Sequence, residues 1–177
     1  MYLLEAVIDK SIVDWDTTWK VIILPFIITI IVSSMIGFER QNVGKAAGLT
    51  SHMFVALAAC GVAVMQRLMF EDTVKTVMEG VSIEASPTRL IAQVITGIGF
   101  VGAGVILKDS TNVIKGITTA ATIFSVAMVG LIIGSGYLLV GGILAGVIIV
   151  FLYSRDLSRR FNPFISHRHD QRDDYHF

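Results

Sequence analysis

The sequence predicts an all-α integral membrane protein with about five transmembrane helices and an N-terminal interfacial helix. Of its 177 residues, 54% are hydrophobic and 16% are charged, whereas a soluble domain has about 45–50% apolar and about 25% charged residues. The excess apolar residues gather in long uncharged runs, which are typical of membrane-spanning helices. The formal net charge is zero, so no nucleic-acid partner is indicated, and the lipid bilayer is the expected environment.

Residues 1–19 are predicted to form an amphipathic segment in the membrane interface. Its apolar side chains recur at roughly helical spacing, and its two tryptophans suit the headgroup level. Acidic residues interrupt the apolar ones and no basic stretch precedes them, so we expect no cleavable signal. The residues that carry the pattern are Leu4, Val7, Ile8, Ile12, Trp15 and Trp19.

Residues 20–153 are predicted to form the transmembrane domain. Pro25 falls in the first turns of the first span, where a missing N–H does little harm. Ser86 followed by Pro87 suits a helix start at the third span. Polar loops connect the first four spans, and a glycine-rich turn joins the fourth to the fifth. The expected spans are residues 21–37, 53–68, 87–107, 117–133 and 137–153.

Residues 154–177 are predicted to be a polar, flexible tail on the cytoplasmic side. The tail holds His167, His169 and His176 with nearby aspartates, and such a tract could bind zinc or nickel. A solvated tail is the favoured interpretation, with metal binding as the alternative.

Five spans place the two termini on opposite sides of the membrane, and basic residues indicate which side is cytoplasmic. With the C-terminus inside, the cytoplasmic face carries nine Lys and Arg residues and the other face carries five. The sequence therefore favours an outer N-terminus and a cytoplasmic C-terminus. The nine residues are Arg40, Lys45, Lys108, Lys115, Arg155, Arg159, Arg160, Arg168 and Arg172.

Glycine pairs predict close helix packing. Gly130 with Gly134, and Gly142 with Gly146, have the small-xxx-small spacing that lets helix backbones approach one another. Packing inside the chain is the favoured interpretation, and contacts within a homo-oligomer are the alternative. The glycines assigned to helix packing are Gly97, Gly99, Gly102, Gly104, Gly130, Gly134, Gly142 and Gly146.

The third span also contains a match to the dinucleotide-binding pattern GxGxxG, at residues 97–102. That motif needs a preceding strand and an acidic residue about 20 positions further on. Here the preceding residues belong to the same apolar run, and the later region reads Ile117-Thr118-Thr119. Nucleotide binding is therefore rejected. The glycines are expected to pack closely or, as the alternative, to break the helix beside a polar interior.

Polar side chains of the third and fourth spans are functional candidates. Arg89 and Gln93 share a helical face, and Gln93 lies about a turn inside the membrane, where an unpaired amide is costly. We expect Gln93 to face protein, whereas Arg89 is either functional or an interfacial anchor. Hydroxyl groups of the fourth span form a stripe, although such groups also bond to their own helix backbone. The stripe consists of Thr118, Thr119, Thr122 and Ser125.

Glu39, Arg40 and His52 are candidates at the inner end of the first two spans. A Glu–Arg pair next to a span is commonly exposed to solvent at the membrane boundary. A buried Glu39, however, needs a cation: Arg40, another basic side chain or a metal ion. No cage of several carboxylates lies in the spans, so bound magnesium is unsupported and no cofactor is expected. No Ser-His-Asp set, Cys-His pair or HExxH motif is present, so we expect no enzymatic activity.

Three sequence blocks, in order and with consistent spacing, resemble the MgtC/SapB family of bacterial membrane proteins. The first has GFER at residues 37–40, AGL at 47–49 and His52. The second reads PxRxxAQVxxGIGFxGAG at residues 87–104, and the third reads GxTTAAT at residues 116–122.

The resemblance implies a multi-pass protein of the bacterial inner membrane that is linked to magnesium limitation and, in some pathogens, to survival in macrophages. Family members are often regarded as regulators that act through membrane partners, and the ATP synthase is among those proposed. The functional candidates carried by the matching blocks are Glu39, Arg40, His52, Arg89, Gln93, Thr118, Thr119 and Thr122.

The sequence departs from the family pattern at several positions. Ser86 stands where an acidic residue usually precedes the proline, which removes a partner for Arg89. Thr50 and Ser51 replace an Arg-Thr pair, and Phe124 takes a position often held by Trp. We expect the short form of the family, without the soluble domain that virulence-associated members carry after the last span.

Two functional hypotheses follow. The first is a non-enzymatic, homo-oligomeric protein with a role in magnesium homeostasis that regulates a membrane protein partner. The alternative is a small ion or solute transporter or channel whose polar path runs between the third and fourth spans. Straight spans would hold Arg89 about 30 Å from Glu39 and Thr118, so these residues form one site only if the third span is broken or re-entrant.

Overall fold

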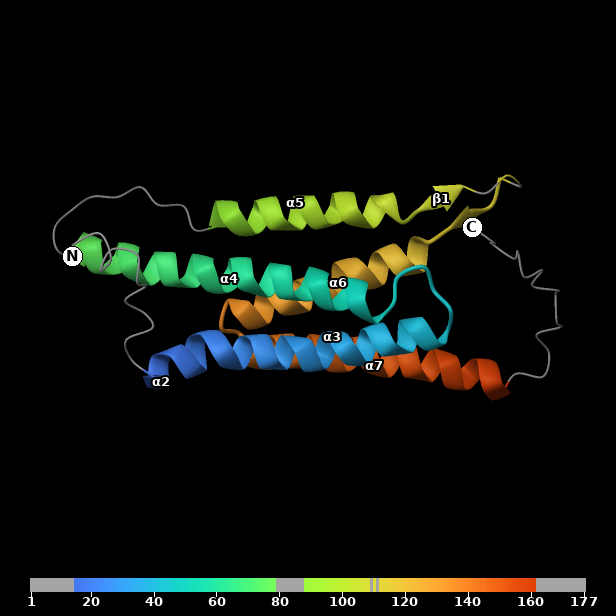
Figure 1. The fold of residues 1–177 in the computed structure, drawn as a ribbon, viewed down its shortest axis with the longest axis horizontal. Helices are drawn as coiled ribbons and strands as arrows, with labels where there is room; N and C mark the ends of the chain where they lie inside the picture. The colour runs from blue at the N-terminus through green and yellow to red at the C-terminus, as the bar shows by residue number, and fades with distance from the viewer. Residues whose placement is uncertain (1–14, 79–87, 109, 111, 162–177) are drawn as a thin grey trace.

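The computed structural model describes residues 15–78, 88–108, 110 and 112–161, and it is almost entirely helical (Figure 1). Within these described residues, four helical segments are long and apolar enough to cross a membrane, and a shorter apolar helix accompanies them. The predicted all-α membrane fold is confirmed. The helices are α2 (Trp15–Thr18), the π-helix η2 (Trp19–Ile23), α3 (Leu24–Asn42), α4 (Leu49–Met78), α5 (Thr88–Gly104), α6 (Ile117–Gly134) and α7 (Leu138–Phe161).

The first span begins with a local rearrangement before Pro25. The N–H of Leu24 donates to the carbonyl of Trp19, five residues back, which closes the π-turn of η2. Proline has no N–H to continue the helical ladder, and such turns commonly absorb the irregularity. The helix then continues without a break through α3 to Asn42.

Helices α3, α4, α6 and α7 form a bundle, with α5 lying along one side of it (Figure 1). Small and β-branched residues fill the places where the helices meet. One cluster joins α4, α5 and α6, a second joins α3, α4, α6 and α7, and a third joins α6 to α7. Helix α6 contributes to all three clusters and is the most enclosed of the four long spans.

The contact between α4 and α6 is a backbone-to-backbone seam. A Cβ atom on Gly130 would lie 2.3 Å from the carbonyl oxygen of Ala56, and one on Gly134 would lie 2.5 Å from that of Cys60. Only glycine fits at such distances. We call this contact the α4–α6 seam.

Helix α5 packs much more loosely. Ile98 is its buried apolar anchor, and a Cβ on Gly102 would lie 3.7 Å from the Ala120 carbonyl oxygen, an ordinary contact distance. Among the residues that the structure describes, a Cβ placed on Gly97, Gly99 or Gly104 would meet no atom within 4 Å. The helix is continuous over its 17 residues, so its glycines do not break it, and its length of about 25 Å is slightly short of the hydrocarbon thickness.

A small antiparallel hairpin connects α5 to α6, where the sequence suggested only a polar loop. Strands β1 (Leu107–Lys108) and β2 (Ile114–Lys115) pair Leu107 with Lys115. Gly116 then enters α6 with a φ of 92°, and a Cβ at this position would lie 2.0 Å from the carbonyl oxygen of Val105. The turn into α6 therefore requires glycine.

Several helices extend beyond their predicted limits. Helix α3 continues through Glu39 and Arg40, which were expected in a loop. Helix α4 reaches Met78, and α7 runs past Tyr153 into the expected tail as far as Phe161. The predictions for the N-terminal residues 1–14, the helix start at Ser86 and the histidine-rich end of the chain lie outside the described residues.

Candidate functional site

The site is built around an ion pair at the last turn of α3. Arg40 donates from Nε and Nη2 to the two carboxylate oxygens of Glu39. The Arg40 side chain is completely buried and that of Glu39 is 4% exposed. Gly44, with a φ of 66°, ends the helix, and backbone N–H groups of Val43 and Lys45 cap the carbonyls of Glu39 and Arg40. This glycine cap holds the pair in a closed turn.

A second guanidinium reaches the same carboxylate from the last helix. Nη2 of Arg155 on α7 lies 3.8 Å from Oε1 of Glu39, and the Arg155 side chain is 26% exposed. One carboxylate therefore contacts two guanidinium groups. We call Glu39, Arg40 and Arg155 the charged cluster.

His52 links α4 to α6 beside this cluster. Its Nδ1 lies 2.7 Å from the carbonyl oxygen of Gly48, and its Nε2 lies 3.2 Å from the Thr122 hydroxyl. A carbonyl only accepts hydrogen bonds, so Nδ1 carries a proton and donates it to Gly48. The Thr122 hydroxyl is in turn 2.9 Å from the Thr119 carbonyl oxygen, so a continuous chain of polar contacts crosses from α4 into α6.

Helix α3 buries two further polar side chains. Thr29 and Ser33 are both buried, and the Ser33 hydroxyl donates to the Thr29 carbonyl at 2.6 Å. Such a bond to the helix's own backbone satisfies a hydroxyl inside a membrane.

The predicted site residues separate into two groups at opposite ends of the bundle. Five of them gather around the charged cluster and the His52 contacts: Glu39, Arg40, His52, Thr119 and Thr122. Thr118 is exposed at the start of α6. Arg89 and Gln93 lie near the other end of α5 and are exposed, away from α4 and α6. Because α5 is unbroken, the structure does not bring the two groups of residues together.

Three residues of the polar interior were not identified from the sequence. The sequence places Arg155 only among the basic residues of the cytoplasmic face. Arg155 follows the last apolar run and Glu39 follows the first, and this shared position at the end of a span was the available signal for a contact between them. Thr29 and Ser33 are four residues apart, and that spacing puts them on the same helical face as Gly37 and Arg40.

The surroundings of Glu39 do not suit a metal cation. Over the residues that the structure describes, no group of three or more His, Cys, Asp and Glu side chains is placed to hold a metal ion. Glu39 already contacts two guanidinium groups, whose positive charge opposes a divalent cation. The buried carboxylate has its counter-ions from the protein itself.

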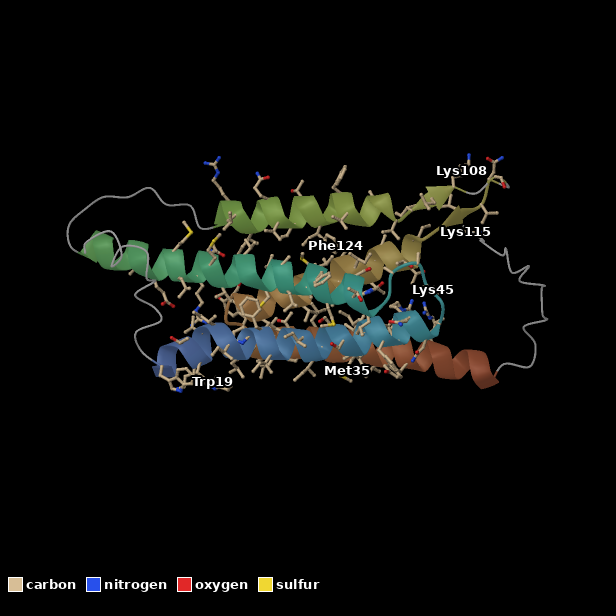
Figure 2. All side chains as sticks on the ribbon, viewed as in Figure 1. Trp19, Met35, Lys45, Lys108, Lys115 and Phe124 are labelled. Carbon is tan, nitrogen blue, oxygen red and sulfur yellow. The ribbon has the colours of Figure 1, made fainter. Side chains whose placement is uncertain are left out.

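Basic residues mark the end of the bundle that holds the charged cluster. Lys45, Lys108 and Lys115 lie at this end and Trp19 at the other (Figure 2). We call it the hairpin end. The apolar spans Trp19–Asn42 and Leu138–Arg155 both finish here. The charged cluster therefore lies where two apolar spans end, which is the level at which basic residues of membrane helices gather.

The fold and the site define a polytopic helical membrane protein with a buried ion-paired centre at one membrane boundary. A sequence model described as the MgtC family matches residues 26–161. The chain belongs to the MgtC family.

Several curated proteins resemble the chain. It is 39% identical over 114 residues to the Escherichia coli K12 protein named "Putative magnesium transporter YhiD", covering 64% of this chain and 51% of that protein. It is 41% identical over 106 residues to Protein MgtC of Brucella abortus strain 2308, covering 60% and 39%. Protein SapB of Bacillus subtilis is 36% identical over 116 residues, covering 66% and 48%.

The matched stretch spans about half or less of these relatives. No solved structure matches the chain.

Proposed function

We propose that this protein is a non-enzymatic membrane protein that supports growth when magnesium is scarce, and that it acts by contacting other polypeptides in the bilayer. Membership of the MgtC family and the magnesium-related name of the E. coli relative support the link to magnesium. The observation that carries the mode of action is the outward face of α5.

This face combines a polar amide with small residues. Gln93 is exposed, and no hydrogen bond joins it to the described residues. Gly97 and Gly104 follow it at helical spacing, and a Cβ on either would meet nothing within 4 Å. Lipid chains offer no hydrogen bonds to an amide, and glycines that pack against nothing only weaken a helix. Another protein surface would satisfy both features.

A second copy of the chain is the occupant that we propose. An amide carries both a donor and an acceptor, so Gln93 can pair with Gln93 of another copy across a two-fold axis. The glycines would let the two α5 helices approach closely. A membrane protein partner would then be recognised by the assembled protein.

The interior does not favour conduction of magnesium. The α4–α6 seam has no room for a methyl group at Gly130 or Gly134. Two guanidinium groups neutralise Glu39 and repel a divalent cation. A regulator of membrane partners is therefore better supported than a magnesium channel.

A transporter remains the second candidate, because the polar side chains of Thr29, Ser33, His52 and Thr122 are buried and one relative carries the name of a transporter. These side chains belong to α3, α4 and α6, whereas the sequence suggested a polar path between the third and fourth spans, which are α5 and α6.

We also infer that the N-terminus lies outside and the C-terminus in the cytoplasm. The basic residues of the hairpin end support this orientation under the positive-inside rule. Protease protection of the C-terminal end in sealed spheroplasts, and its cleavage in inverted vesicles, is the expected result.

Growth at limiting magnesium tests the proposed function. A strain lacking its own MgtC-type protein is complemented with the chain, with Gln93→Leu, and with Gln93→Asn, which retains the amide. We expect Gln93→Leu to reach the membrane in normal amount and lose the growth advantage, while Gln93→Asn keeps most of it. Equal growth of Gln93→Leu and the parent would refute a role for this face.

Ion flux separates the two candidates. The purified chain is reconstituted into vesicles and magnesium flux is followed under a concentration gradient, with Glu39→Ala as the control. We expect no flux from the parent protein above that of empty vesicles. Flux that depends on Glu39 would favour the transporter.

A further inference from the structure

The charged cluster contains a buried guanidinium whose donors are not all used. Arg40 gives two of its donors, Nε and Nη2, to the Glu39 carboxylate. Arg40 is completely buried, and its Nη1 atom has no hydrogen-bond acceptor among the described residues. A buried charged donor without an acceptor is costly, and native structures rarely leave one unexplained.

We propose that the charged cluster is a binding site for a phosphate oxyanion, supplied by a phospholipid headgroup or by free phosphate. A phosphate group offers several acceptor oxygens in the geometry that guanidinium groups bind bidentately. One of its oxygens would accept a hydrogen bond from Arg40 Nη1, and its negative charge suits a site lined by two guanidinium groups. A cation could not accept that hydrogen bond.

The location of the cluster suits a headgroup. Arg155 is the last residue of one apolar span, and the span containing Glu39 and Arg40 ends at Asn42. Lipid phosphates lie just outside the hydrocarbon that these spans cross. Basic pockets between helices at this level are suited to anionic headgroups.

The exposed side of the charged cluster offers an entry route for the anion. Arg155 is its partly exposed member, and its contact with Glu39, at 3.8 Å, is longer than a hydrogen bond. An incoming anion meets Arg155 first and draws its side chain from Glu39. Arg40 keeps its bidentate pair with Glu39 and contributes Nη1 to the anion.

Binding is measured on the purified full chain in detergent by native mass spectrometry and by thermal unfolding. The additions are phosphatidylglycerol, phosphatidylcholine or inorganic phosphate. We expect phosphatidylglycerol to remain bound and to raise the melting temperature, while phosphatidylcholine does neither. If inorganic phosphate alone gives the same stabilisation, the source is free phosphate. If neither phosphatidylglycerol nor inorganic phosphate binds in preference to phosphatidylcholine, in which choline cancels the phosphate charge, the proposal is wrong.

Variants separate the site from general surface charge. Arg155→Gln should weaken binding about tenfold or more. Arg155→Lys keeps the positive charge but cannot bind the anion bidentately, so its affinity should lie between those of Arg155→Gln and the parent. Lys108→Gln removes an exposed positive charge at the same end of the bundle and should change binding less than twofold. Equal losses in Arg155→Gln and Lys108→Gln would assign the binding to diffuse electrostatics and overturn the proposal.

Circular dichroism of each variant establishes that it is folded. If Arg155→Gln does not fold, the comparison of Arg155→Lys with Lys108→Gln still decides the question, because equal affinities in those two variants would contradict the site. The proposal does not depend on the proposed function, since binding is measured without reference to growth or flux.

Discussion

The glycines of α6 and those of α5 are alike in sequence and opposite in environment. A Cβ added to Gly130 or Gly134 would overlap the α4 backbone, whereas one added to Gly97 or Gly104 would meet no atom of the described residues within 4 Å. The same contrast holds for polar groups, because Glu39 and His52 are buried and paired while Gln93 is exposed. Small residues in a membrane helix therefore indicate a close approach without indicating which chain supplies the other surface.

Alanine substitutions of these glycines give the largest expected difference between the two regions. Gly134→Ala forces a methyl group against the Cys60 carbonyl, and we expect a loss of about 3 kcal/mol or more in the free energy of unfolding. Measured on single copies, in detergent dilute enough in protein to separate any dimer, Gly97→Ala should be neutral or stabilising by up to about 1 kcal/mol, because alanine favours the helix. Thermal unfolding in detergent, followed by circular dichroism, measures both. Similar losses in both variants would remove the distinction between a packed and an open face.

The charged cluster can be compared with an exposed ion pair of the same chain. Glu39→Gln leaves two guanidinium groups without their carboxylate, and we expect a loss of about 3 kcal/mol or more.

Glu71→Gln is the matched control, since the Arg67–Glu71 pair at 3.3 Å is partly exposed on both sides and should contribute less than about 1 kcal/mol. The same unfolding assay measures both variants. A small effect of Glu39→Gln would mean that the cluster is not the electrostatic centre of the bundle.

The threonines of α6 provide the finest comparison. Thr122→Val removes the hydroxyl that His52 Nε2 contacts, so we expect a loss of about 1 kcal/mol. Thr118→Val changes an exposed position at the start of α6, so its stability should stay within about 0.5 kcal/mol of the parent. If the two variants are equally stable, the contact between α4 and α6 through His52 contributes nothing.

Much of the architecture could be predicted from the sequence, because uncharged runs of sufficient length have few alternatives to a membrane helix. The residues at which helices end were harder to predict. Glu39 and Arg40 look like loop residues beside an apolar run, yet the glycine cap at Gly44 extends α3 through them. Similarly, the hairpin after α5 depends on two very short strands, whose pairing leaves little signal in composition.

The site could be predicted only in part. The spacing of Thr118 and Thr122 indicated one helical face, but one residue of the pair is exposed and the other contacts His52, 70 residues away. The contact between Arg155 and Glu39 joins the last helix to the first long one. Such long-range pairs depend on how the helices are arranged, and periodicity within a single helix does not specify that arrangement.

Cysteine cross-linking in membranes tests most directly the claim that α5 presents its open face to another copy. Gly97→Cys is compared with Gly146→Cys on α7, where a Cβ also meets nothing within 4 Å, and with the parent, whose Cys60 is buried. A disulfide needs Cα atoms within about 7 Å. We predict that mild oxidation converts Gly97→Cys to a covalent dimer and leaves Gly146→Cys and the parent monomeric. Absence of a Gly97→Cys dimer, or equal dimer formation in Gly146→Cys, would contradict the account.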